Sequence, residues 1–347
     1  MRRRAFLKSS IILPLGAGLS VSILSATRGR YEALSDMPFA SQEIYPCLFE
    51  REGRSFLVTG GGIAVRLGDP VLSKMALYDL QTHQWQEGVA LPEARHHIAL
   101  AQAAGQLHAF GGFRRNGLDM WQMRTEHWRI SDPLNGVWEA AAPLPGPRAE
   151  AVTLLTENKL HMIGGRVPAG DANADWEDHR DSGLHHRYDP AADRWEELAP
   201  LPEARNSSAG AVLDDQLYVI SGRTVNRQES RSCSRYHLLS DRWETIAPLP
   251  PSPRAASKEG QGGLAAAVLD GKIYAFGGEW LGGERGVFDD AWEYSPASDR
   301  WTATTPMTRP RHGLGAVAAN GAIYLLGGAT NPGGSGVTAY LDRFTVE

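Results

Sequence analysis

Short apolar runs alternate with turn-forming residues along most of the chain. In the first unit, apolar runs at residues 44–50, 54–59, 74–80 and 85–89 are separated by turn signals at Glu52-Gly53 and at residues 81–84. Runs this short, bounded by Gly, Asp and Gln, predict strands rather than helices. We therefore expect four antiparallel strands in this unit, named a to d in chain order.

The same unit recurs along the chain, and a glycine pair marks the end of each second strand. The pairs, one of them Ser-Gly, fall at residues 61–62, 111–112, 164–165, 221–222, 277–278 and 327–328, at intervals of 50 to 57 residues. A period of about 50 residues with four short strands in each period indicates a β-propeller. We predict an all-β fold of six four-stranded antiparallel blades.

The fourth strands give the sharpest internal alignment and indicate how the ring closes. Five segments begin with Trp and end with Arg, at residues 85–95, 138–148, 195–205, 243–254 and 301–311. A sixth copy lies near the N-terminus, at residues 31–41, with Tyr31 in the place of Trp and Ser41 in the place of Arg. The N-terminal strand, residues 31–36, is thus predicted to complete the last blade and to remove its open edge.

The glycine pair, Tyr and Trp, in this order, resemble the Kelch repeat, whose members are built as β-propellers. The resemblance covers residues 31–347. Four tyrosines precede the Trp of their unit by seven residues: Tyr78, Tyr188, Tyr236 and Tyr294. We expect each Tyr and Trp to lie on neighbouring strands and to pack between blades. By architecture and compartment, the chain also resembles the exported Kelch-type N-acetylneuraminate epimerases, without a catalytic motif that carries over.

Residues 1–26 resemble an export signal and are expected to lie outside the fold, leaving one propeller domain at residues 27–347. The segment Arg3-Arg4-Ala5-Phe6-Leu7-Lys8 resembles the twin-arginine motif, and an apolar stretch runs from Ile11 to Leu24. This stretch is shorter than the roughly 20 residues of a membrane span. We expect cleavage after Ala26 and a periplasmic location, with an uncleaved anchor as the alternative and the sole contact with a membrane.

Charge and cysteine content narrow the choice of partners. The net charge is −5, and no basic run occurs beyond the extreme N-terminus, which argues against a nucleic-acid partner. The two cysteines, Cys47 and Cys233, fall in the first and fourth units, on opposite sides of the predicted ring. Two separate free thiols are therefore expected, although an exported protein is able to form disulfides.

The b–c and d–a connections share one face, and their varied polar sequences predict the binding surface. The ligand-binding candidates on it are Arg95, Arg148, Arg205, Arg254, Arg311, Asn206, Lys258 and Trp280. A ring of guanidinium groups suits a carboxylate, a phosphate or a sugar acid. The alternative is a structural role for the repeated arginines, in which they bind loop carbonyls or acids of neighbouring blades, as is common at this position of Kelch-like repeats.

Residues that break the repeat are better candidates for chemistry, because symmetry does not demand them. The catalytic candidates of this kind are His97, Glu150, Glu259, Glu279 and His312. The connection at residues 168–186 is rich in Asp, Glu and His but lacks a ligand spacing typical of zinc or calcium, so we expect a solvated loop. Its Trp176 is a candidate lid or stacking platform. We predict no metal and no cofactor, because the copper–cysteine–tyrosine constellation of Kelch-type oxidases is not matched.

These observations leave several functions open. The first is a periplasmic module that binds an anionic small molecule, such as a sugar acid, or a protein through its Arg-rich face. The alternative is a sugar-acid epimerase or mutarotase, in which a general acid and base act beside a carboxylate held by Arg205 or Arg254. A maturation factor for another exported protein is a third hypothesis. The sequence favours binding and does not decide whether the protein is an enzyme.

Overall fold

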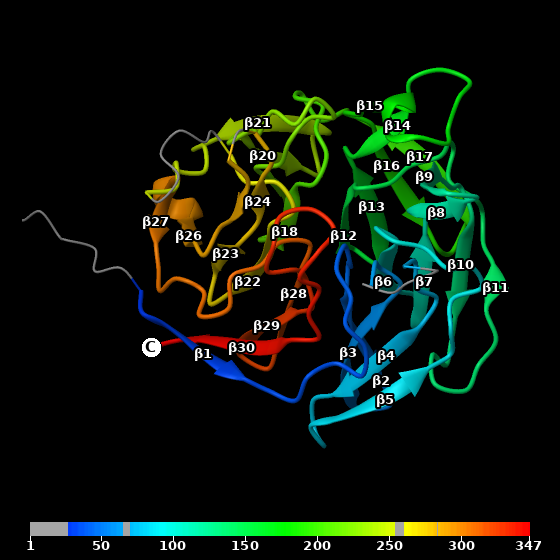
Figure 1. Ribbon diagram of the computed structural model, residues 1–347, viewed down its shortest axis with the longest axis horizontal. Coiled ribbons are helices and arrows are strands. Elements are labelled where there is room, and N and C mark those ends of the chain that lie inside the picture. The colour runs from blue at the N-terminus through cyan, green and yellow to red at the C-terminus, as the bar shows by residue number, and fades with distance from the viewer. Residues whose placement is uncertain (1–26, 65–69, 254–259, 283) are drawn as a thin grey trace, which may run out of the picture.

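The computed structural model describes residues 27–64, 70–253, 260–282 and 284–347, and shows six sheets arranged in a ring (Figure 1). The predicted signal segment lies outside the described residues. So do three candidate residues, Arg254, Lys258 and Glu259. The strands within the described ranges confirm an all-β, six-bladed propeller.

Each blade is a four-stranded antiparallel sheet. Blades 1 to 3 contain β2 (Cys47–Arg51), β3 (Arg54–Gly60), β4 (Met75–Asp79) and β5 (Gln84–Gly88); β6 (Ala99–Ala103), β7 (Gln106–Phe110), β10 (His127–Ile130) and β11 (Glu139–Ala140); and β12 (Val152–Thr156), β13 (Lys159–Ile163), β16 (His185–Asp189) and β17 (Arg194–Leu198). Blades 4 to 6 contain β18 (Ala209–Leu213), β19 (Gln216–Ile220), β20 (Cys233–His237) and β21 (Arg242–Ile246); β22 (Ala265–Leu269), β23 (Lys272–Phe276), β26 (Ala291–Ser295) and β27 (Arg300–Ala303); and β28 (Gly315–Ala319), β29 (Ala322–Leu326), β30 (Leu341–Val346) and β1 (Gly29–Ala33).

Three b–c connections fold into small hairpins of their own. These are β8 (Phe113–Asn116) with β9 (Asp119–Met123), β14 (Arg166–Pro168) with β15 (His179–Asp181), and β24 (Glu279–Trp280) with β25 (Gly286–Val287). The 3-10 helix η1 (Trp176–Asp178) lies between β14 and β15, and η2 (Pro296–Ser298) joins β26 to β27. The hairpins extend the face on which the candidate site lies.

The N-terminal strand closes the ring, as the sequence predicted. Strand β1 pairs antiparallel with β30, and Tyr31 lies opposite Phe344 with ring centroids 5.0 Å apart. The Tyr31 hydroxyl also donates to the Thr305 carbonyl at 3.0 Å. The strand occupies residues 29–33 rather than 31–36, and beyond it the Leu34 amide still donates to the Leu341 carbonyl at 2.9 Å.

The Tyr and Trp of each repeat hold neighbouring blades together. Tyr78 lies directly opposite Trp85 in the register of β4 and β5, with ring centroids 5.1 Å apart. The indole N–H of Trp85 then donates to the Ser35 carbonyl in the preceding connection at 2.9 Å. Equivalent bonds run from Trp138, Trp195, Trp243 and Trp301 to a carbonyl of the blade before. The predicted packing of the aromatic pairs between blades is confirmed.

Two further findings concern the cysteines and the helices of the protein. Cys47 and Cys233 are free thiols, as predicted. Within the described part of the chain, no helix has the length and apolar character needed to cross a bilayer.

Candidate binding site at the channel mouth

One residue in each d–a connection has a left-handed backbone, and together these residues form a ring. They are Glu43, His97, Glu150, Ser207, Gly263 and Gly313, with φ between 51° and 65°. Five amide-to-carbonyl bonds of 2.8 to 3.3 Å link neighbouring members, such as the Glu43 amide to the Gly313 carbonyl and the His97 amide to the Glu43 carbonyl. We name this feature the axial ring, because it passes from blade to blade around the propeller.

The axial ring places three ionisable side chains at one level. A left-handed conformation costs a residue with a Cβ roughly 1 kcal/mol, and glycine avoids this cost. Glycine occupies only two of the six positions. At Gly313 a Cβ would lie 2.9 Å from the carboxyl carbon of Glu43, so this glycine also makes room for that side chain. Backbone strain retained at Glu43, His97 and Glu150 is typical of a functional site.

A second set of equivalent positions follows the glycine pairs. These residues are Ile63, Phe113, Arg166, Arg223, Glu279 and Ala329, and each forms an antiparallel bridge with the adjoining d–a connection. The positions are charged in blades 3, 4 and 5 and apolar in blades 1, 2 and 6. This set of positions is therefore charged on one side of the ring and apolar on the other.

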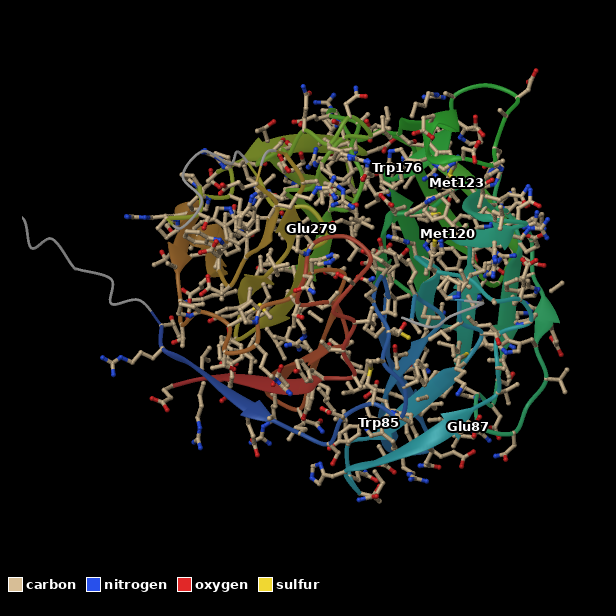
Figure 2. All side chains as sticks on the ribbon, viewed as in Figure 1. Trp85, Glu87, Met120, Met123, Trp176 and Glu279 are labelled. Carbon is tan, nitrogen blue, oxygen red and sulfur yellow. The ribbon has the colours of Figure 1, made fainter. Side chains whose placement is uncertain are left out.

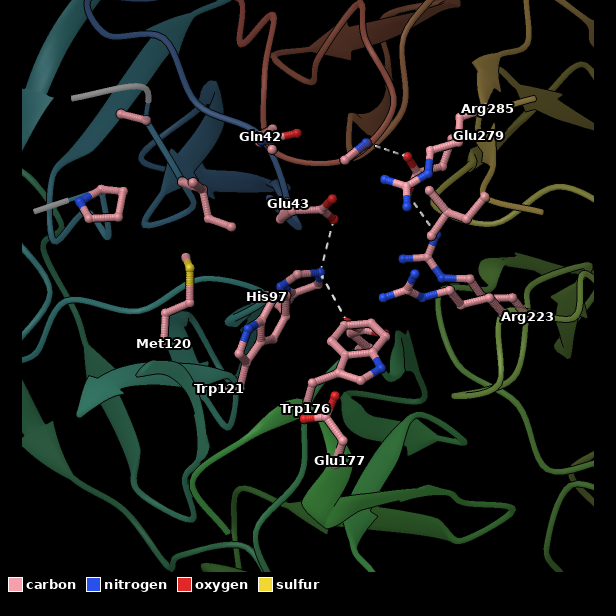
Figure 3. Close-up of a pocket in the computed structure, with 18 residues that line it drawn as sticks. Gln42, Glu43, His97, Met120, Trp121, Trp176, Glu177, Arg223, Glu279 and Arg285 are labelled. Carbon is pink, nitrogen blue, oxygen red and sulfur yellow. Dashed lines mark hydrogen bonds and ion pairs between the residues drawn. The ribbon is translucent and has the colours of Figure 1, made fainter. Parts of the chain in front are cut away.

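Three members of each set line a cavity of about 530 Å³ on the face that carries the b–c hairpins (Figure 3). They are Glu43, His97 and Glu150 of the axial ring, and Ile63, Arg223 and Glu279 of the second set. In Figure 3, Trp121 and Trp176 stand at one side of the opening, and Arg223 and Glu279 stand at the other. Figure 2 shows Met120, Trp176 and Glu279 around the middle of the molecule, whereas Trp85 and Glu87 lie at the outer edge. The lining residues include Glu43, His97, Trp121, Glu150, Trp176, Arg223, Arg227, Glu279 and Arg285.

A chain of hydrogen bonds fixes the proton positions of His97. His96 donates from Nε2 to the Met120 carbonyl at 2.6 Å, and burial lowers the pKa of His96 to about 3, so its Nδ1 carries a lone pair. His97 must then donate from its own Nδ1 to that atom, across 2.7 Å. Its Nε2 faces the Glu43 carboxylate at 2.9 Å and that of Glu150 at 3.5 Å. The ring of His97 is therefore held between His96 on one side and two carboxylates on the other.

Neighbouring positive groups lower the pKa of two buried carboxylates, Glu43 and Glu150, at the floor of the cavity. Burial alone would raise the pKa of Glu43, but His97, His312 and Arg223 outweigh burial and hold it below its ordinary value. Burial likewise opposes ionisation of Glu150, and Arg166, His97 and Arg223 lower its pKa. Both carboxylates are therefore ionised at neutral pH, although they are buried.

Several buried polar atoms at this floor have unused hydrogen-bonding capacity. Within the described ranges, Arg223 Nε, Arg166 Nε and Nη1, and Glu150 Oε1 form no hydrogen bond. Arg166 Nη1 and Glu150 Oε1 face each other at 3.5 Å, as an ion pair that is long for a hydrogen bond. Buried polar atoms without partners are uncommon in native proteins and often mark a place where a ligand or water binds.

The structure brings four of the five predicted catalytic candidates together. His97, Glu150 and Glu279 line the cavity. His312 lies beside Glu279, with 3.5 Å between Nδ1 and Oε1. The fifth candidate, Glu259, lies outside the described residues. Whether these residues catalyse a reaction stays a prediction.

The four repeated arginines that the structure describes do not line the cavity. Arg95, Arg148, Arg205 and Arg311 are buried, and none of them lines it. Each donates to backbone carbonyls at the end of strand b or in nearby connections; Arg205 bonds the carbonyls of Ser221, Glu203, Val219 and Ser232. This geometry favours the structural alternative for these four.

The equivalent positions in the other two blades show how the repeat adapts. Ser41, aligned with these arginines in the sequence, donates its hydroxyl to the Gly61 carbonyl at 2.8 Å and takes over one of their bonds. In blade 5 the equivalent place belongs to Gln261, whose carbonyl accepts from the Gly222 amide as the Arg carbonyls do elsewhere. The alignment of Arg254 with this place is therefore wrong, because the connection before blade 5 is longer than the others.

Two of the three remaining ligand-binding candidates, Asn206 and Trp280, contact other protein groups and do not line the cavity. The Asn206 amide donates to the Asp181 carboxylate at 2.6 Å. Trp280 packs against Phe288, with ring centroids 4.6 Å apart. Lys258 lies outside the described residues. The ligand-binding role of these three stays a prediction.

Sequence reasoning did not select Glu43, although a signal for it existed. Ser41 aligns with the repeated arginines, so Glu43 aligns with His97 and Glu150, two positions beyond them. Trp121 was also missed, because blade 2 departs from the repeat there. Arg223 was not among the ligand-binding candidates, because it follows a glycine pair and does not occupy the repeated arginine position.

The histidine-rich connection at residues 168–186 agrees with the expected solvated loop over residues 169–178, which are exposed or half-buried, and differs from it at its histidines. His179 is buried against Phe113, with ring centroids 5.5 Å apart, and His185 is buried against His161. Trp176 covers the Arg166 guanidinium at 3.5 Å, next to the cavity, which fits the predicted stacking platform. The acids and histidines of this connection point to different surroundings and form no metal-binding cluster among the described residues.

A profile of the KLHDC2/KLHL20/DRC7 Kelch-repeats domain matches residues 49–278, and the Kelch motif matches residues 262–308. The chain belongs to the Kelch-repeat family. Propellers of this family are commonly protein-binding modules.

Relatives share the repeat over most of this Kelch propeller. The Kelch-like protein terF of Aspergillus terreus is 26% identical over 72% of the chain, and human Kelch-like protein 34 is 28% identical over 72%. Beta-scruin of Limulus polyphemus is 24% identical over 79%. The matches span only 53%, 37% and 29% of those relatives, respectively.

A solved structure confirms the fold. The structure of YjhT aligns with a TM-score of 0.72 and 16% identity, over 90% of this chain and 99% of that one. At this identity the likeness concerns the fold alone.

Proposed function

We propose that this Kelch propeller binds an anionic small molecule of the sugar-acid class in the cavity at the channel mouth. The observation that carries the proposal is the unused hydrogen-bonding capacity of Arg223, whose Nε is buried at the lining of the cavity without a partner. A guanidinium group suits a carboxylate because it presents two parallel donors. Arg227 and Arg285 are exposed at the same opening and add positive potential.

The rest of the lining suits a sugar ring. Trp121 and Trp176 meet edge to face, with ring centroids 4.8 Å apart, and form an aromatic wall. Carboxylates, guanidinium groups and the His97 ring offer acceptors and donors for hydroxyl groups. A cavity of about 530 Å³ is within the usual range of small-molecule sites.

Isothermal titration with N-acetylneuraminate and glucuronate tests this proposal, with glucose as the neutral comparison. Arg223→Met should weaken binding of the acids by about 10- to 100-fold, the value of a lost charge-assisted hydrogen bond. Arg235→Met, in the same blade but bonded to Glu244 outside the cavity, is the matched control and should bind normally. Equal binding of the acids by the Arg223 and Arg235 variants would contradict the proposal.

An epimerase or mutarotase is the second candidate function, and the His97 network favours it. The Nε2 atom of His97 lies between the Glu43 and Glu150 carboxylates, so these three groups are placed to pass a proton to or from a bound sugar. Exchange of anomers, followed by NMR, should fall by at least about 100-fold in His97→Gln, with less change in ligand affinity. If exchange is absent from the unaltered protein while sugar acids bind, the protein is a binding module.

A protein partner is the outcome to pursue if no sugar acid binds. The curated relatives are longer chains, so their partners are no guide to this one.

We also propose export to the periplasm, supported by the twin-arginine pattern at residues 3–8. Fusion of residues 1–26 to a reporter that must fold before export should deliver it to the periplasm. Arg3→Lys with Arg4→Lys should retain the reporter in the cytoplasm, and unchanged delivery would contradict this route.

A further inference from the structure

Three metal-ligating side chains from three blade connections aim one atom each at a common point. His312 Nδ1 lies 3.6 Å from Glu43 Oε1 and 3.5 Å from Glu279 Oε1, and all three atoms fall within 4.8 Å of one another. Metal–ligand bonds of about 2.0–2.2 Å in a tetrahedron place the ligand atoms about 3.3–3.6 Å apart. Both distances from His312 fit that spacing.

The hydrogen bonds of His312 direct a lone pair toward this point. Its Nε2 donates to the Asn331 carbonyl at 2.9 Å, so any lone pair on the ring lies on Nδ1. His312 is fully buried, and Nδ1 forms no hydrogen bond with any residue the structure describes. A buried lone pair that faces two carboxylate oxygens is unfavourable unless a proton or a cation lies between them.

The second atom of each ligand is held by the surrounding protein. Glu43 Oε2 is bound by His97 Nε2 at 2.9 Å, and Glu279 Oε2 accepts from the Gly333 amide at 2.7 Å. His312 is held through its bond to the Asn331 carbonyl. Metal sites have this arrangement, in which outer hydrogen bonds orient each ligand and fix the histidine tautomer.

We propose that Glu43, Glu279 and His312 form a site for a first-row divalent metal ion such as Zn²⁺. One imidazole nitrogen with two carboxylate oxygens suits Zn²⁺ better than Mg²⁺ or Ca²⁺, which prefer oxygen ligands alone. Glu43 and Glu279 line the cavity, so an ion here leaves a further coordination position open toward it. The proposal goes beyond the sugar-acid site, since the three metal ligands are side chains of the protein and the metal binds without a sugar acid.

Arg223 should weaken metal binding at this site, whereas it should strengthen binding of a sugar acid. Its removal therefore changes the two affinities in opposite directions. Its Nη1 donates to Glu279 Oε1 at 2.7 Å, the same oxygen that faces His312. A guanidinium group so close repels a divalent ion. Arg223→Met should therefore strengthen metal binding, whereas it should weaken binding of a sugar acid. The two proposals are distinguishable with a single variant.

The test is titration of the metal-free chain, after treatment with EDTA, with Zn²⁺ alone and with Co²⁺ alone. We expect one equivalent to bind, and Co²⁺ to gain the visible absorption of a site with nitrogen and oxygen ligands. His312→Ala and Glu279→Gln should each weaken binding by more than about 100-fold, beyond the 10- to 100-fold that an outer-shell change costs. Mg²⁺ and Ca²⁺ should bind more weakly than Zn²⁺.

The control changes a His–Glu pair on β20 and β21, away from the proposed site. His237 Nε2 lies 2.9 Å from Glu244 Oε2 at the surface, so His237→Gln removes an alternative zinc ligand and should leave the affinity unchanged. Circular dichroism confirms that each variant is folded, and Glu279→Gln serves if His312→Ala does not fold. No Zn²⁺ binding by the unaltered chain, or binding lost in His237→Gln and kept in Glu279→Gln, overturns the proposal. Sugar-acid binding is measured with EDTA present, so its outcome is independent.

Discussion

At the scale of single residues, the same side chain type takes two roles according to its place in the repeat. The described arginines at the repeated position in the d–a connections are buried and bonded to carbonyls, so the repeat itself explains them. Arginines that follow a glycine pair occur in only two blades, at Arg166 and Arg223, and both keep unused donors. Position within the repeat therefore separates structural arginines from candidate ligand-binding arginines.

Arg205→Ala is expected to destabilise the protein without changing ligand affinity. The substitution leaves four buried carbonyls without their donor and opens a cavity, which should lower the free energy of unfolding by about 3 kcal/mol or more. Denaturant unfolding measures this loss, and titration with the sugar acids at a temperature where the variant is folded measures affinity. A stable Arg205→Ala variant with weakened ligand binding would assign Arg205 to the site.

At the scale of elements, the closure of the ring rests on one five-residue strand. Strand β1 supplies the outer edge of blade 6 and places Tyr31 against Phe344. Without it, β30 would expose an unpaired edge, which favours aggregation. The stability of a closed propeller thus depends on residues at opposite ends of the sequence.

Tyr31→Ala should lower the free energy of unfolding by about 3 kcal/mol, since it removes the ring contact with Phe344 and the bond to Thr305. Glu32→Ala is the matched control in the same strand. Glu32 pairs with Arg343 at the surface, and its loss should cost less than about 1 kcal/mol. Equal losses for the two variants, measured by thermal or denaturant unfolding, would show that the strand contributes no more than a surface pair.

The same closure predicts complementation by a peptide. Deletion of residues 27–33 should yield an aggregation-prone chain, and a synthetic peptide of residues 27–36 should restore cooperative unfolding by adding the missing strand. A deleted chain that unfolds cooperatively without the peptide would mean that three strands suffice for blade 6.

At the scale of the whole molecule, burial of histidines couples the fold to pH. Seven histidines have a pKa lowered to about 3 or about 4, with burial as the first cause; they are His96, His108, His127, His161, His179, His185 and His186. Two pairs lie between strands b and c of blades 2 and 3, at 2.9 Å for His108 and His127 and 2.8 Å for His161 and His185. These pairs are neutral in the folded protein.

We therefore expect stability to fall as the pH decreases from about 6.5 to about 4.5. In this range the unfolded chain binds protons that the buried histidines reject, so each histidine contributes up to about 1.4 kcal/mol per pH unit. The contribution is fully present above the unfolded pKa of about 6.5 and is lost as the pH falls toward the folded value. Denaturant unfolding across this range measures the slope.

A double variant assigns the pH effect to the histidines. His108→Gln with His127→Gln should reduce the slope by close to two protons, although it also changes the stability at pH 7. His83→Gln, which replaces an exposed histidine, should leave the slope unchanged. A slope that is flat in the unaltered protein, or unaffected by the double variant, would contradict the prediction.

The sequence by itself determined the architecture, because a propeller is specified by local signals that repeat. Glycine pairs, turn residues and the Tyr–Trp pairs act within one blade or between neighbours, so counting them yields six blades. The N-terminal closure also followed, since Tyr31 and Ser41 align with the repeated strand. The face that carries the cavity followed from the alternation of strand direction.

Only the tertiary structure decided which residues form the site. Glu43, Glu279 and His312 come from three blade connections, and no spacing in the sequence relates them. The axial ring brings the side chains of Glu43, His97 and Glu150 together, and the order of residues in the sequence does not show this. Nor does the sequence show that the buried Arg205 donates to backbone carbonyls. Local interactions repeat along the chain, whereas the site is built from the positions at which the blades differ and which closure of the ring brings together.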